Sequence, residues 1–156
     1  MALEYGKIYK DAQGTFMPEF YVYNVAFTGI TGAAPSAVQT IQTQSDADFV
    51  LQRMNYWFID AAAATEFVTQ ANQELPDLTL QVTDSATSKN FFFAPMPINA
   101  IASYNAIFPN DLPVWRTVKK GASLTFAIAS TKTFANSNNL TIALIGFKKL
   151  RVSGIA

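Results

Sequence analysis

The strongest constraint on the fold comes from two runs of alternating residues in the last third of the chain. Leu, Phe and Ile alternate with small or polar residues over 123–129, and Leu and Ile alternate with Thr and Ala over 140–144. A period of two is typical of a β-strand with one buried face. A Ser/Asn-rich link at 130–139 joins the two runs. We therefore expect an antiparallel pair at the centre of a β-sandwich.

The rest of the chain predicts further strands and little helix. Each predicted strand is a short run rich in apolar, β-branched or aromatic residues. These strands are expected at 19–30, 37–43, 49–59, 78–84, 91–94 and 113–118. The segment Asp60–Ala71 favours a helix, although a loop crossing the end of a sandwich fits it too. With an irregular crossover at 98–113, the pattern predicts an all-β fold, a β-sandwich or jelly roll of about eight antiparallel strands.

The 156-residue chain is predicted to form one domain with an extended N-terminal arm. Residues 1–17 show no stable apolar period and are punctuated by Gly6 and Gly14. We expect this arm to lie across a neighbouring subunit or to fray as a free terminus. The sandwich itself is expected over 18–156.

Two predicted strands suggest edges or contacts with other chains. The strand 19–30 has aromatic or branched residues on both faces, which predicts cover on both sides, the second from a partner chain. In the strand 37–43, Val38 and Ile41 do not share a face, which predicts a bulge or a weak edge.

The strand 49–59 places a charge among apolar side chains. Arg53 falls on the face that Phe49 and Trp57 share. A charge on such a face is costly unless it is paired. We therefore expect Arg53 to reach Asp46, Asp48 or a carboxylate of a partner chain.

The surface composition favours contact with other protein. Charged residues make up 14% of the chain, against about 25% in typical soluble domains, and thirteen residues are Phe. Such a surface favours an oligomer or a part of a larger assembly. The alternative is that Thr, Ser, Asn and Gln supply the solvated surface instead.

Several classes of function lack the residues they need. The chain has no Cys and no His, which excludes thiolate metal sites, thiol nucleophiles and any Ser-His-Asp triad. The net charge is zero and the basic residues do not form the clusters of a nucleic-acid footprint, so no nucleic acid is expected. No Gly-rich phosphate loop, signal peptide or membrane span is recognised, so we expect synthesis in the cytoplasm without export and no membrane partner.

Carboxylates offer two further hypotheses. A glycosidase would need two of Asp46, Asp48, Asp84 and Asp111 as acid and base, yet the sequence favours turn and strand-cap roles for these residues. A calcium site would use Asp46 and Asp48 with Asp84, although a hard cation needs more oxygen ligands than this spacing provides. We therefore predict no catalytic residue, no cofactor and no metal.

A carbohydrate-binding module remains open as an alternative. Its platform would be formed by exposed aromatic side chains, with Tyr21, Tyr23, Tyr56 and Trp115 as candidates. Aromatic residues on strands more often belong to a core or to an oligomer interface.

Four short patterns resemble a known family. They are an Asp-Ala-Asp-Phe strand opening at 46–49, a Thr-Asp-Ser turn at 83–85, a Lys-Gly-x-x-Leu-x-Phe-x-Ile strand at 120–128 and an Ile-Ala-Leu-x-Gly-x-Lys strand at 142–148. Together they resemble the small jelly-roll virion proteins of tailed bacteriophages, such as capsid cement or decoration proteins. The resemblance covers roughly 46–150; the chain departs from it at 61–72 and in the N-terminal arm.

The resemblance implies a structural role in a virion. The partners would be the major capsid protein or other virion proteins, with the chain itself forming a homo-oligomer, and no catalytic residue is carried over. Aromatic residues would anchor the contacts. The expected interface residues are Tyr5, Tyr9, Tyr21, Tyr23 and Trp115. A fibre module that binds carbohydrate and a tail or neck joint protein are the alternatives.

Overall fold

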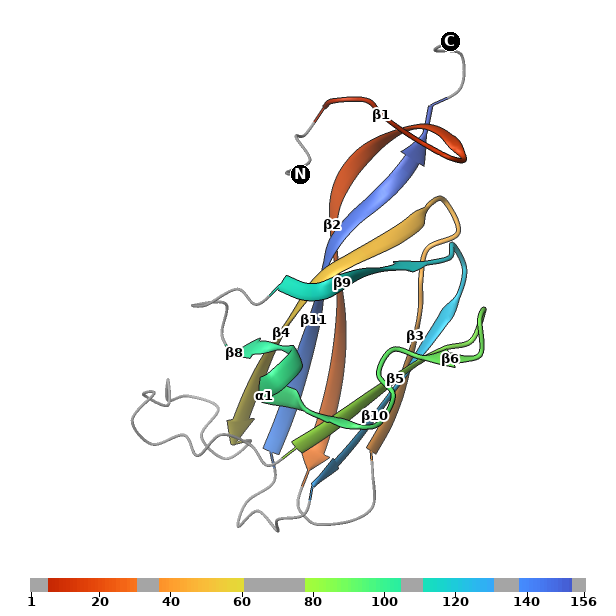
Figure 1. Cartoon of the computed structure of the whole chain (residues 1–156). Coiled ribbons are helices and arrows are strands. Elements are labelled where there is room, and N and C mark those ends of the chain that lie inside the picture. Colours follow the sequence, from red (N-terminus) through yellow and green to blue (C-terminus); the bar gives the residue numbers. More distant parts are fainter. Residues whose placement is uncertain (1–5, 31–36, 61–77, 105–110, 131–137, 153–156) are drawn as a thin grey trace.

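Two β-sheets face each other in the computed structural model, which describes residues 6–30, 37–60, 78–104, 111–130 and 138–152 (Figure 1). One sheet has six strands and the other has five. The all-β fold predicted from the sequence is therefore confirmed, and the two layers are consistent with a β-sandwich. Among the described residues, no helix is long and apolar enough to cross a membrane.

The described elements are eleven strands and one short helix, and most of the strands fall where alternation predicts them. They are β1 (Tyr9–Asp11), β2 (Gly14–Ile30), β3 (Ala37–Gln42), β4 (Asp48–Asp60), β5 (Leu78–Asp84), β6 (Lys89–Asn90), β7 (Met96–Pro97), α1 (Ile98–Ile101), β8 (Ser103–Tyr104), β9 (Asp111–Val118), β10 (Ser123–Ser130) and β11 (Asn138–Arg151).

The long strands alternate between the two sheets along the chain. The six-stranded sheet has the order β1-β2-β11-β4-β8, with β9 also paired to β4, and the five-stranded sheet has the order β3-β10-β5-β6, with β7 paired to β5. Almost all of these pairs are antiparallel; β4 and β8 run parallel. Successive long strands from β2 to β5 thus lie in opposite layers, and the same holds from β9 to β11.

The core lies between the sheets and is built by the alternating positions. On β10, Leu124 and Phe126 are fully buried while their neighbours Ser123 and Thr125 are partly exposed. Burying one face of each strand removes apolar area from water, the main stabilising contribution to folding. The same cluster includes Val25, Phe27, Phe49, Leu51, Leu80, Val82, Leu140, Ile142 and Leu144.

The expected pairing of the last two strands is wrong. β10 lies between β3 and β5, whereas β11 lies between β2 and β4 in the other sheet. Each run therefore occupies the middle of its own layer, and the two meet only across the core. Alternation identifies a strand with one buried face, but it does not identify the strand's neighbour.

The expected face of Arg53 is also wrong, because β4 contains a β-bulge. The register between β11 and β4 shifts between Ile145 and Gly146, so that Arg53 and Leu51 oppose these two residues and Gln52 is the extra residue. A bulge reverses the alternation beyond it. Phe49 and Leu51 before the bulge, and Met54 and Tyr56 after it, are therefore all fully buried. Arg53 lies on the outer face, half-buried, and the two expected carboxylates bind lysines instead.

Gly146 makes the close approach at this bulge possible. A Cβ atom at Gly146 would lie 1.9 Å from the carbonyl oxygen of Val50 on the neighbouring strand. Ordinary van der Waals contact begins at about 3.4 Å, so only glycine fits between the two backbones.

The N-terminal segment is part of a sheet where the structure describes it. β1 forms a hairpin with the start of β2, in the register Tyr9 to Phe16. The start of β2 in turn pairs with the end of β11, where Phe16 faces Arg151. β1 and the start of β2 are thus part of the six-stranded sheet. They and the end of β11 extend beyond the five-stranded sheet at the top of Figure 1.

Three other sequence predictions have mixed outcomes. β3 is an edge strand, as expected, but its pairing with β10 is regular and contains no bulge. The run 91–94 is a bend and not a strand: Phe91 turns into the core, while Phe93 is fully exposed. The predicted helix at 60–71 lies mainly outside the described residues, and the crossover at 98–113 contains α1 and β8.

Candidate binding surface

A second apolar cluster lies on the outer face of the six-stranded sheet, opposite the core. Phe147 on β11 stands between Phe20 on β2 and Val50 on β4 in the register of the sheet. The ring of Trp115 on β9 meets the ring of Phe147 edge-on, with centroids 6.2 Å apart. Nearer the β1–β2 hairpin, the rings of Tyr9 and Phe16 stack with centroids 5.9 Å apart. We call these residues the outer aromatic patch: Tyr9, Phe16, Phe20, Val50, Trp115 and Phe147.

The patch combines a buried base with exposed aromatic side chains. Phe16, Val50 and Phe147 are each more than nine-tenths buried. Phe20 and Trp115 are 64% and 41% exposed. Single exposed apolar residues are common, but a group seated on a packed base is a candidate binding surface. The packed base holds the exposed rings in place.

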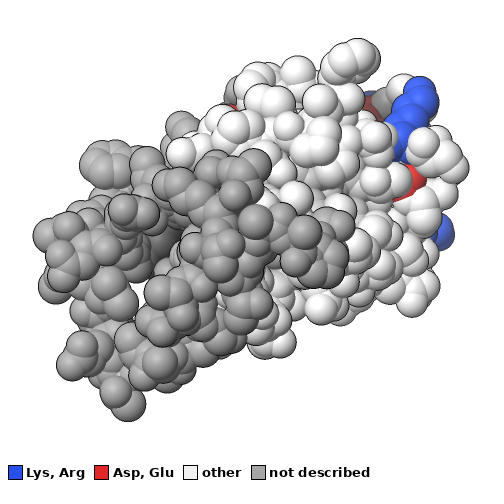
Figure 2. Space-filling view, turned by 90° about the horizontal axis from the view of Figure 1, so that it is seen from below, with Lys and Arg blue, Asp and Glu red and all other residues white. Residues whose placement is uncertain are grey.

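Charged residues are sparse on part of the molecular surface and gather at one end of it. Figure 2 shows a face where the described residues are mostly uncharged; most of the Lys, Arg, Asp and Glu atoms in view lie at its right-hand edge, and a small acidic area lies at its upper left. Contact with protein at such a face removes few charges from water.

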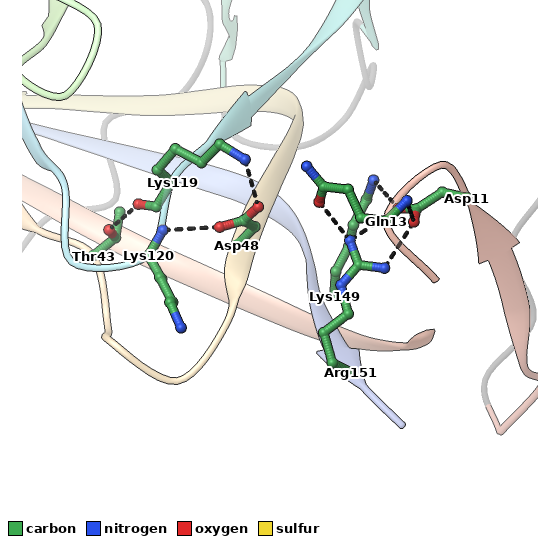
Figure 3. Close-up of polar contacts among 8 residues, drawn as sticks. All are labelled: Asp11, Gln13, Thr43, Asp48, Lys119, Lys120, Lys149 and Arg151. Atoms are coloured by element: carbon green, nitrogen blue, oxygen red, sulfur yellow. Dashed lines mark hydrogen bonds and ion pairs between the residues drawn. The ribbon is translucent and has the colours of Figure 1, made fainter. Parts of the chain in front are cut away.

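An ion-pair network borders the outer aromatic patch at its hairpin end (Figure 3). Arg151 Nη1 donates to Asp11 Oδ1 at 2.7 Å, and Lys149 Nζ donates to Asp11 Oδ2 at 3.1 Å. The cations of Lys149 and Arg151 also lie over the ring of Phe16, at 5.0 and 5.7 Å from its centroid. The hydrogen bond from Arg151 holds the pKa of Asp11 well below its usual range. The network ties the β1–β2 hairpin to the end of β11.

Tyr21 and Tyr23 lie on the opposite, inner side of β2. Their rings pack against the main core, with centroids 4.8 Å apart. The backbone N–H of Gln44 donates to Tyr23 Oη at 2.9 Å, and the Gln44 side chain donates to Tyr21 Oη at 2.6 Å. Burial raises the pKa of Tyr23. In this structure the two tyrosines hold the link between β3 and β4 against β2.

Lys148 is the buried cation of this inner region. Its side chain is 4% exposed, and its Nζ contacts Asp46 Oδ2 at 3.0 Å, the side-chain oxygen of Gln44, and the ring of Tyr21 at 3.9 Å. The hydrogen bond from Lys148 lowers the pKa of Asp46. Burial opposes the charge on Lys148, but the contacts with Asp46 outweigh it and raise the lysine's pKa.

The other candidate carboxylates also have structural partners. Asp48 accepts hydrogen bonds from Lys119 Nζ at 3.0 Å and from the backbone N–H of Lys120 at 3.1 Å (Figure 3). Burial raises the pKa of Asp48, but these two hydrogen bonds together with the charges of Lys119 and Arg151 lower it by more. Asp84 accepts bonds from Ala86 N–H and the Thr87 hydroxyl, and so stabilises the turn after β5.

These carboxylates do not assemble into an acid–base pair or a cation site. Asp46 and Asp48 each hold a lysine, Asp84 closes its own turn, and Asp111 lies on the exposed start of β9. In the part of the chain that the structure describes, no group of three potential metal-ligating side chains is present. An open depression of about 560 Å³ lined by residues 42–46 contains Asp46, whose charge is already paired with Lys148.

The predicted interface residues therefore fall in different places. Tyr9 and Trp115 lie in the outer aromatic patch, Tyr21 and Tyr23 lie on the inner face, and Tyr5 lies outside the described residues. Tyr56, a candidate for a sugar platform, is fully buried. The sequence patterns do not predict Phe16, Phe20 or Phe147 as site residues. Their positions on β2 and β11 carry a detectable signal, since large apolar residues fall on both faces of these two strands.

Comparison of the chain with models of protein families, with curated proteins and with solved structures finds no match.

Proposed function

We propose that this protein is a structural virion protein that decorates or cements a capsid through protein–protein contacts. The observation that carries the proposal is the outer aromatic patch, where Phe20 and Trp115 stand exposed on a buried base. Aromatic side chains dominate the binding energy of protein interfaces, especially near the centre of the contact. The partner would be the major capsid protein, in agreement with the family that the sequence resembles.

The surroundings of the patch support binding to protein. An interface centre is depleted of charge and surrounded by a polar rim. Here the ion pairs of Asp11 with Lys149 and Arg151 border the patch at one end. Because Phe147 holds Trp115 from below, little side-chain freedom would be lost on binding. A standard interface buries about 800 Å² on each partner, so residues around the patch would contribute as well.

The strand order supports a jelly roll as the architecture behind this role. The first and last long strands, β2 and β11, are neighbours in one sheet, while β3 and β10 are neighbours in the other. A chain wound in this way passes from layer to layer with each long strand, as in the double-sheet jelly rolls of viral proteins. We include this finer fold assignment in the proposal.

Binding to assembled phage capsid shells tests the proposal. Purified protein is mixed with shells and sedimented, and the bound fraction is measured against concentration. Phe20→Ser should weaken binding about thirtyfold, because loss of a central aromatic anchor typically costs about 2 kcal/mol. Val114→Ser is the matched control: Val114 is 65% exposed, also on a strand of the same sheet, but outside the patch.

Two outcomes would contradict the proposal. Equal binding by the Phe20 and Val114 variants would separate the patch from shell binding. Retention of the protein on a polysaccharide column, without sedimentation with shells, would instead favour the carbohydrate-binding alternative. Circular dichroism of each variant ensures that a loss of binding is not a loss of folding.

A further inference from the structure

Among the residues that the structure describes, β3 forms an open edge of the five-stranded sheet. It pairs with β10 on one side, and the sheet order begins with it (Figure 1). Val38, Gln39, Thr40 and Gln42 are exposed. An open strand presents backbone N–H and C=O groups that pair readily with another strand.

The register identifies which backbone groups point outward. The N–H of Thr43 donates to the carbonyl of Ala122, directly opposite it, at 2.8 Å. In an antiparallel pair, hydrogen-bonded positions recur at every second residue. Ala37, Gln39 and Ile41 therefore direct their backbone groups to β10. Val38, Thr40 and Gln42 direct theirs away from the sheet.

The side chains of these outward positions also face solvent. Ala37 and Ile41 pack against the core, so Val38, Thr40 and Gln42 lie on the outer face of the five-stranded sheet. The Thr40 hydroxyl is 3.2 Å from the hydroxyl of Thr125 on β10, on this same face.

β3 lacks the features that normally protect an edge. Residues 37–42 contain no charge and no proline, and their pairing with β10 shows no bulge. Natural edges are usually blocked by lysine, proline, bulges or short length. The edges of the six-stranded sheet follow that rule: β1 has three residues and carries Lys10 and Asp11, and the unpaired side of β2 carries Pro18 and Glu19.

We propose that β3 pairs antiparallel with β3 of a second copy of this chain, about a two-fold axis at Thr40. In this register Thr40 faces Thr40 of the second copy, and Val38 faces its Gln42. Val38, Thr40 and Gln42 of each copy direct their backbone N–H and C=O groups to the other copy. The three residue pairs form two hydrogen bonds each, six in total. The two-fold axis is perpendicular to the sheet, so the outer faces of both five-stranded sheets lie on the same side. Val38, Thr40 and Gln42, which all lie on the outer face, can therefore pair with one another.

A second copy fits this edge because the edge is complementary to itself. No charge lies between residues 37 and 45, so the pairing brings no like charges together. Thr opposite Thr is a favourable cross-strand pair. The two five-stranded sheets would join into one continuous sheet of ten strands. The outer aromatic patch lies on the other sheet, so this inference stands independently of the proposed function.

Light scattering of the full chain tests the pairing. The expected result is a dimer of twice 17.1 kDa. Thr40→Lys places two like charges opposite each other and should weaken the dimer at least about tenfold. Thr125→Lys adds the same charge on the same face, one strand inward, and should leave the dimer intact.

Cysteine cross-linking tests the register, since the chain contains no other cysteine. Thr40→Cys should form a disulfide-linked dimer under mild oxidation, because residues opposite each other across the axis lie about 5.5 Å apart. Thr125→Cys should not form a disulfide-linked dimer. The two cysteines would be three strand spacings apart, a distance of about 14 Å.

Hydrogen exchange offers a readout that needs no substitution. The amides of Val38, Thr40 and Gln42 should be protected only at concentrations where the dimer forms, whereas Gln39 and Ile41 should be protected at all concentrations. A monomer by light scattering, a dimer unaffected by Thr40→Lys, or equal cross-linking at positions 40 and 125 would each overturn the proposal.

Discussion

Replacing Gly146 by alanine tests whether the bulge of β4 depends on a close approach of two backbones. The added Cβ would lie 1.9 Å from the carbonyl oxygen of Val50, whereas ordinary contact begins at 3.4 Å. The strands must therefore separate by about 1.5 Å, the difference between these two distances. A shift of that size breaks the neighbouring ladder hydrogen bonds, whose length is ordinarily about 2.9 Å.

The expected cost follows from the terms involved. Two weakened hydrogen bonds contribute about 1 kcal/mol each, and strain in a well-packed sheet contributes about 1–3 kcal/mol. The reduced freedom of the unfolded chain offsets about 0.5–1 kcal/mol. The net loss of stability is about 3 kcal/mol. For a chain of this length, this corresponds to a fall in Tm of about 6–12 °C.

Thermal unfolding followed by circular dichroism measures this effect. Gly121→Ala is the control: Gly121 has a φ of +70° but nothing within 4 Å of the added Cβ. Its cost should therefore be the conformational one alone, about 1–2 kcal/mol. If Gly146→Ala lowers Tm no more than Gly121→Ala does, crowding against β4 is not what requires glycine here.

Two further substitutions test the polar and apolar parts of the fold. Asp46→Asn removes the carboxylate that binds buried Lys148 and should lower the free energy of unfolding at pH 7, although water partly screens the pair because Asp46 is half-exposed. The pKa of Asp46 is lowered on folding, so its contribution to the free energy of unfolding is present above about pH 4 and is lost as the pH falls further. Urea unfolding at several pH values should therefore show a smaller loss of stability at acid pH for Asp46→Asn than for the control Asp111→Asn. Phe126→Ala should cost about 3–5 kcal/mol in urea unfolding, because Phe126 is fully buried at the centre of β10, and a cost as small as that of neighbouring Thr125→Ala would contradict its place in the core.

Local sequence patterns predict only part of the candidate binding surface. The sequence predicts Trp115 and Tyr9 as interface residues, and both lie in the outer aromatic patch. It also predicts Tyr21 and Tyr23 as interface residues, yet they lie on the inner side, where they bind Gln44. A strand with apolar residues on both faces does not reveal which face is the core. That choice depends on which face meets the other sheet.

The sequence by itself determined the all-β class and the position of most long strands, because alternation along a strand is a local consequence of burying one face. Only the tertiary structure decided that β10 and β11 lie in different sheets, because strand pairing depends on contacts between distant residues. The tertiary structure also decided the face of Arg53, since one bulged residue at Gln52 reverses the alternation beyond it. The same packing brings Phe20, Phe147 and Trp115, from three distant segments, onto one outer face.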